Sequence, residues 1–171
     1  MKPVFSVATL VFTALAPCAA AAASAPMSAS AYGAGPHGYD WAIGTWSCTN
    51  SMPSSMGGPN TQTLTVTRTN GGAIFYHAVG QNFDNSWYNV YQPKTKSWVS
   101  PFILADGSYG TESTSQTGKK IVWIGMAVDA SGRSMHIRDT NTISATKYAD
   151  LGEYQSGGAW KEQYNVSCTK S

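Results

Sequence analysis

The sequence has few of the residues that usually carry catalysis or metal binding. Its 171 residues include three cysteines and three histidines. No histidine has a cysteine or carboxylate at the spacing of a zinc site, and no Asp-rich calcium loop occurs. A Gly-x-Ser-x-Gly nucleophile motif is also absent. We therefore predict no metal, no cofactor and no catalytic residues that a motif would identify.

Charge and helical periodicity are scarce as well. Lys and Arg number 11 and Asp and Glu number 9, so the chain is nearly neutral. Such a balance gives no electrostatic footprint for nucleic acid, and we exclude nucleic acid as a partner. Apolar residues do not recur at a helical period over any helix-length segment. Thr, Ser, Tyr, Trp, Val and Gly are plentiful instead, which predicts an all-β protein.

The first 23 residues have the layout of a secretory signal peptide. Lys2 precedes an apolar run over residues 4–15, and small residues follow. The run is too short for a transmembrane segment, so we predict a secreted or periplasmic protein without one. An alternative is a lipoprotein attached through Cys18, although Pro17 stands where such a motif has Gly or Ala. Residues 24–38 are predicted to be a flexible linker, and residues 39–171 a single β-barrel domain.

Turn residues divide that domain into short strands. Asn70-Gly71, Asp84-Asn85, Asp106-Gly107 and Ser131-Gly132 lie in four of the predicted turns. The longest irregular segment is the predicted loop 51–60. The turns delimit eleven segments, from which we predict a barrel of about ten strands: 44–50, 61–69, 73–81, 86–92, 97–105, 108–116, 120–128, 133–139, 142–150, 153–158 and 159–170. Because the connections are short, neighbouring strands should pair as an antiparallel meander.

The first and last predicted strands should close this meander into a barrel. Side chains alternate along a strand, so Trp46 and Cys48 share one face of the first strand, and Cys168 shares a face with Tyr164 in the last. Closure removes both exposed sheet edges and brings the start of the first strand beside the end of the last. In an oxidising compartment we therefore predict a disulfide between Cys48 and Cys168. The alternative is two unpaired thiols in a sandwich.

The segment YDWAIGTWSC, residues 39–48, resembles the start of the calycin superfamily, which includes lipocalins, fatty-acid-binding proteins and nitrobindin-like barrels. The chain also resembles small secreted bacterial β proteins of uncharacterised role. The calycin resemblance implies an up-and-down barrel with a short helical turn before the first strand. Residues 39–43 would be the lid of the closed end, and Trp46 its plug.

Two strand residues are candidates for polar chemistry. His77 shares parity with Phe75, and an inward His77 would be the candidate axial ligand in a haem-binding barrel. The alternative is a hydrogen-bonded strand histidine, and the late segment that carries the haem histidine in nitrobindin-like proteins has no counterpart. Glu162 shares parity with Trp160 and Tyr164, which predicts a lumen carboxylate paired with Arg68, Arg138 or a tyrosine hydroxyl. An enzyme could use Glu162 with His77 or a tyrosine as an acid–base pair.

Aromatic residues give the stronger indication of function. They recur on successive predicted strands, and a closed barrel of ten strands can keep a cavity, whereas eight or fewer would be filled by side chains. We therefore predict non-catalytic binding of a small apolar or amphipathic molecule in the lumen. An envelope protein that contacts a partner through outward aromatics is a further alternative. The predicted ligand-binding residues are Trp46, Tyr76, His77, Trp98, Trp123, Trp160, Glu162 and Tyr164.

Overall fold

The computed structural model describes residues 35–52, 58, 60–81 and 83–171. The predicted signal peptide, Cys18 and most of the predicted linker therefore lie outside the described residues. So does most of the predicted loop 51–60. Within the described part of the chain, no helix is long and apolar enough to cross a membrane.

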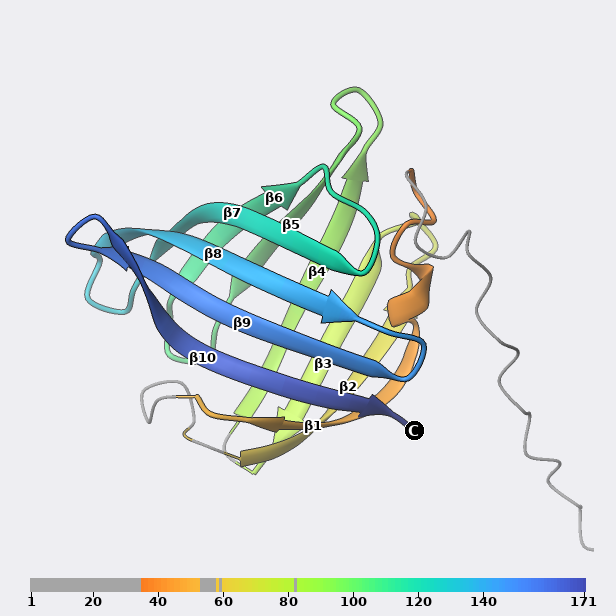
Figure 1. The fold of residues 1–171 in the computed structure, drawn as a ribbon, viewed down its shortest axis with the longest axis horizontal. Helices are drawn as coiled ribbons and strands as arrows, with labels where there is room; N and C mark the ends of the chain where they lie inside the picture. Colours follow the sequence, from red (N-terminus) through yellow and green to blue (C-terminus); the bar gives the residue numbers. More distant parts are fainter. Residues whose placement is uncertain (1–34, 53–57, 59, 82) are drawn as a thin grey trace, which may run out of the picture.

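Ten antiparallel strands form a closed barrel, which confirms the predicted fold class (Figure 1). Each strand pairs with its neighbours in sequence, and β1 pairs with β10 to complete the circle. A 3-10 turn, η2 (Asp40–Ala42), precedes the first strand. The strands are β1 (Gly44–Asn50), β2 (Asn60–Arg68), β3 (Ile74–Gly80), β4 (Phe83–Gln92), β5 (Ser97–Ile103), β6 (Tyr109–Thr114), β7 (Lys120–Val128), β8 (Ser134–Ile143), β9 (Lys147–Ser156) and β10 (Ala159–Lys170).

The seam between β1 and β10 is held by the predicted disulfide. Cys48 lies directly opposite Cys168, and the two are bonded. Trp46 and Cys48 are buried whereas Ser47 and Thr49 are exposed, so β1 alternates as its sequence predicts. Closure pairs every strand on both sides and leaves no free edge in the sheet.

Several strand boundaries differ from the sequence prediction. Asp84-Asn85, predicted as a turn, belongs to β4. The Asn85 side chain points inward and its Oδ1 accepts a hydrogen bond from Ala105 N at 2.9 Å, so this polar residue has a structural partner. The predicted strand 142–150 is interrupted by a turn, where Ser144 N donates to Lys147 O at 2.8 Å. The predicted strand 153–158 is the end of β9 and not a separate strand.

The turn η2 covers one end of the barrel, the closed end, where β10 finishes (Figure 1). Trp46 Nε1 donates a hydrogen bond to Ala42 O at 2.8 Å, and Lys170 Nζ donates one to Trp41 O at 3.1 Å. Trp41 and Ala42 belong to this turn and are buried in the aromatic core that it covers. The helical turn and the position of Trp46 under it thus agree with the prediction.

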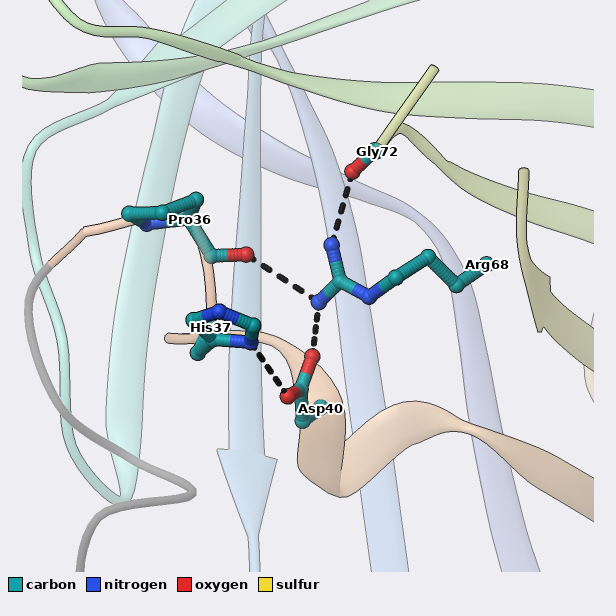
Figure 2. Close-up of polar contacts among 5 residues, drawn as sticks. All are labelled: Pro36, His37, Asp40, Arg68 and Gly72. Atoms are coloured by element: carbon teal, nitrogen blue, oxygen red, sulfur yellow. Dashed lines mark hydrogen bonds and ion pairs between the residues drawn. The ribbon is translucent and has the colours of Figure 1, made fainter. Parts of the chain in front are cut away.

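Arg68, at the end of β2, ties the N-terminal segment to the same end (Figure 2). Its guanidinium donates to Gly72 O at 2.8 Å and to Pro36 O at 3.1 Å, and it forms an ion pair with Asp40. His37 adds a 2.9 Å contact to Asp40. The last residues of the predicted linker, 35–38, are therefore bound to the barrel. Arg68 does not meet Glu162, one of the three partners predicted for that carboxylate.

Candidate functional site

The barrel encloses a cavity of about 450 Å³. Its floor is formed by Trp41 and Trp46 at the closed end. At the opposite end, the loops that follow β5 and β7 line its mouth through residues such as Ser108 and Ala130. Ten strands make a wider barrel than eight, and here the side chains do not fill it. The volume lies within the range of ordinary small-molecule sites.

Four of the eight predicted ligand-binding residues line this cavity, namely Trp46, Tyr76, Trp123 and Tyr164. They come from β1, β3, β7 and β10 and thus surround the lumen. Trp98 is buried but is not in the cavity wall. Its ring packs against that of Tyr39, with the ring centroids 4.8 Å apart, within the core of the closed end.

His77 is on the outside of the barrel, which corrects the prediction. It pairs laterally with Thr65 and Ser86, both exposed, and its Nε2 lies 2.9 Å from Asp84 Oδ1. Its neighbour Tyr76 takes the inward position, because adjacent residues of a strand face opposite ways. The haem hypothesis required an inward His77 and loses its ligand. Among the described residues, no group of His, Cys, Asp and Glu could hold a metal ion.

Trp160 and Glu162 also face outward, because β10 contains a bulge. The pairing with β9 shifts between Glu162 and Tyr164, so the extra residue reverses the alternation of side chains before it. Glu162 is exposed, and Trp160 lies under the guanidinium of Arg138, which is 4.5 Å from its ring centroid. Arg138 is paired with Glu153 at 2.7 Å.

The prediction that Glu162 and His77 could act together as an acid–base pair is therefore wrong. Glu162 is on the outer face of β10 and His77 on that of β3, with β1 and β2 between these strands. Neither residue lines the cavity. An enzyme built on these two side chains is not supported by the geometry.

The lumen carries three carboxyl groups that the sequence interpretation missed, here called the acid cluster: Glu112, Asp139 and Asp150. They project from β6, β8 and β9. Glu112 is 9% exposed, and one of its carboxyl oxygens, Oε2, is buried without a hydrogen-bond partner. Asp139 and Asp150 are part-buried, and both belong to the wall of the cavity.

Hydrogen bonds hold two members of the acid cluster, Asp139 and Asp150, in place. Tyr164 OH donates to Asp139 Oδ2 at 2.8 Å, and Asn141 Nδ2 donates to Asp150 Oδ1 at 2.8 Å. Asn141 is itself oriented by Trp123, whose Nε1 donates to Asn141 Oδ1 at 2.9 Å. The polar groups are thus fixed by side chains from β7, β8, β9 and β10, and their geometry is set before any ligand arrives.

Burial keeps the acid cluster protonated to unusually high pH. Desolvation raises the pKa of Asp139 to about 6, although hydrogen bonds from Tyr164 and Glu112 act in the opposite direction. Desolvation also raises the pKa of Glu112, and the nearby Asp139 and Asp150 raise it further. The pKa of Asp150 is raised as well, first by burial and then by the nearby Asp139. Like charges buried in one cavity resist simultaneous ionisation.

A glycine opposite Tyr164 makes room for its ring. Gly152 pairs with Tyr164 across β9 and β10, and a Cβ added to Gly152 would lie 2.2 Å from Tyr164 Cε1. No side chain fits there while the ring stays in place. The ring therefore lies over the backbone of Gly152, and this position lets its hydroxyl reach Asp139.

We expect Gly152→Ala to lower the free energy of unfolding by about 1 to 3 kcal/mol, because the added methyl group must push the Tyr164 ring away. In a Tyr164→Ala background the same substitution should be neutral or stabilising, since glycine in a strand is itself unfavourable by about 0.5 to 1 kcal/mol. Urea unfolding of the four proteins in this double-mutant cycle measures the difference. Equal losses in both backgrounds would show that the backbone and not Tyr164 is the obstacle.

No family model matches this sequence, and a comparison with curated proteins gives no match. The resemblance of residues 39–48 to the start of calycin barrels therefore stays a prediction, although the barrel and the helical turn that it implied are present. The cavity and the residues that line it are the features of this protein that indicate a function.

Proposed function

We propose that this protein binds a small amphipathic molecule inside its barrel. The observation that carries the proposal is the hollow interior, about 450 Å³ in volume and open at one end. A barrel that served only as a scaffold would gain stability by filling this space, because unfilled apolar volume costs contacts that a packed core would have.

The wall of the cavity suits a ligand with an apolar body and a polar group. Tyr76 and Trp87 stack with their ring centroids 5.0 Å apart, and Leu64 and Val66 add aliphatic surface. The carboxyl groups of the acid cluster project from β6, β8 and β9, and amide side chains on β2, β4, β8 and β10 add further polar groups to the wall. Apolar surface with a few fixed polar groups is the usual composition of a small-molecule site.

We place this activity outside the cytoplasm, in a secreted or periplasmic protein. The disulfide between Cys48 and Cys168 supports this location, because such bonds persist mainly in oxidising compartments. The signal-like composition of residues 1–23 supports it independently. The hollow lumen favours ligand binding over the alternative of an envelope protein that acts only through outward aromatics.

The proposal is tested by identifying what the protein carries. Protein purified from the extracytoplasmic fraction of its own host should release a small molecule on denaturation, detected by mass spectrometry. Ala127→Trp should abolish this cargo, because Ala127 lines the cavity and is 8% exposed. The matched control is Ala149→Trp on β9, whose lateral neighbours Ser167 and Thr142 are exposed on the outer face.

We expect cargo from the wild type and from Ala149→Trp and none from Ala127→Trp. Equal amounts from the two variants would place the ligand outside the barrel. A wild-type protein that carries nothing from its host would count directly against the proposed function.

A further inference from the structure

Three buried polar atoms of the described residues that line the cavity lack a hydrogen-bond partner: the acceptors Glu112 Oε2 and Asn89 Oδ1, and the donor Trp41 Nε1 at the closed end. Glu112 Oε2 is buried without a partner, and so is Asn89 Oδ1, whose residue is 5% exposed and lines the cavity from β4. The Asn89 amide nitrogen is already used, since it donates to Tyr76 OH at 3.2 Å. Two buried acceptors from different strands therefore lack a donor. Leaving such groups unsatisfied is costly, which indicates a ligand that supplies hydrogen-bond donors.

In the part of the chain that the structure describes, the acid cluster has no basic side chain beside it. Arg133 is the one basic residue among the described residues that line the cavity, and it lies near the mouth, paired with Asp129 at 3.0 Å. Lys161, near the start of β10, is exposed and does not line the cavity. Nothing in the described wall neutralises the acid cluster, and buried carboxylates require a cationic partner or a proton.

Aromatic rings surround the acid cluster. Trp123 and Tyr164 are hydrogen-bonded into the same network, and Tyr148 OH lies 3.3 Å from Asn141 Nδ2. All three rings line the cavity. The faces of such rings attract cations, and they also pack well against flat apolar groups. Carboxyl groups with aromatic rings beside them form an environment suited to an organic cation.

We infer that the molecule bound in the lumen carries a protonated amine on a compact aromatic or aliphatic body, with the ammonium group at the acid cluster of Glu112, Asp139 and Asp150. This inference rests on the proposed function and specifies its ligand class. The ammonium donates the hydrogen bonds that Glu112 Oε2 lacks and supplies the missing positive charge. The apolar body lies against Trp123 and the other aromatic rings that line the cavity. Anionic amphiphiles such as fatty acids are excluded by like-charge repulsion.

Binding should also release protons. The carboxyl groups of the empty lumen hold protons because of burial and because they act on one another. The other titratable groups that interact with them are Glu153, which raises the pKa of Asp139, and the tyrosines Tyr39, Tyr76, Tyr148 and Tyr164. An ammonium group favours the ionised carboxylates. Amine affinity should therefore be higher at pH 8 than at pH 5, where Asp139 retains its proton.

The test compares three probes that share one ring system and differ in charge: tryptamine, 3-ethylindole and indole-3-propionate. Isothermal titration with purified protein at pH 7.5 should give a dissociation constant for tryptamine at least about tenfold lower than for 3-ethylindole, and no binding of indole-3-propionate. Glu112→Gln and Asp139→Asn keep the shape of the wall and should each weaken tryptamine binding by about tenfold or more while leaving 3-ethylindole unaffected.

Glu162→Gln is the matched control. It removes one carboxylate from the exposed outer face of β10 and should leave all three affinities unchanged. If it weakens tryptamine binding as much as Asp139→Asn does, the effect is one of overall charge, and the assigned position of the ammonium is wrong.

The outcomes separate the two proposals. Preference for 3-ethylindole or indole-3-propionate over tryptamine would overturn the amine inference and leave lumen binding standing. Failure of all three probes to bind at millimolar concentration, together with host-derived cargo that contains no amine, would also overturn the inference alone. Absence of any cargo would remove the proposed function itself.

Discussion

Replacing Cys48 and Cys168 together by serine is expected to lower the free energy of unfolding by about 3 to 5 kcal/mol. The bond joins residues 120 positions apart in sequence, so it restricts most of the unfolded chain. It also joins the first and last strands at the one seam where the barrel closes. Urea unfolding followed by tryptophan fluorescence, with linear extrapolation to water, gives the difference.

The control is the response to a reducing agent. Dithiothreitol should destabilise the wild type by a similar amount and leave the serine variant unchanged. The variant should still form a barrel, because five residue pairs between β1 and β10 remain in register. A loss below about 1 kcal/mol would mean that strand pairing alone closes the sheet and that the long-loop entropy argument fails here.

Much of the fold could be predicted from the sequence, because its signals are local. Turn residues separate the strands, and alternation places Trp46 and Cys48 on one face of β1. Short connections then force antiparallel neighbours, and closure follows from the cost of free edges. The bounds of β1, β7 and β10 agree with the predicted ranges 44–50, 120–128 and 159–170.

The bulge in β10 could not be predicted, and its effect on the candidate site is large. If side chains alternated through Gln163 without interruption, Glu162 would face the lumen as predicted. The register shift between Glu162 and Tyr164 puts it on the outer face. No glycine or proline marks the position, so the segment gives no local sign of an extra residue. One extra residue moves every side chain beyond it to the opposite face of the sheet. Residues on the two sides of a bulge therefore cannot be assigned to one face by counting in twos.

The three members of the acid cluster differ in how clearly the sequence indicates that they face inward. Asp139 shares parity with Ile137, which is buried, and the alternation of β8 would have placed it inward. Asp150 shares parity with Tyr148 in the same way. Glu112 lies among Thr and Ser residues in β6, and no apolar neighbour indicates which face is buried. Its inward position follows only from pairing with Ser100, itself buried, across β5.

The second large effect is expected for Trp46→Ala, which should cost about 3 to 5 kcal/mol of unfolding free energy. Trp46 is 1% exposed and its ring packs edge-on against those of Trp41 and Tyr148. Its indole N–H donates the hydrogen bond to Ala42 O that joins η2 to β1. Lys170 Nζ lies 5.0 Å from the centroid of the same ring. Removing the ring therefore opens a cavity in the core and releases the turn that covers the closed end.

Two further substitutions divide this loss into its causes. Trp46→Phe keeps an aromatic ring and loses the bond to Ala42, so a cost of about 1 to 2 kcal/mol is expected from the hydrogen bond and the smaller ring. Trp160→Ala removes a ring of the same kind from the outer face, where its contact with Arg138 is worth about 0.5 to 1 kcal/mol. Equal destabilisation by Trp46→Ala and Trp160→Ala in urea unfolding would show that Trp46 does not hold the turn η2 over the closed end. The floor of the proposed ligand site would then depend on other contacts.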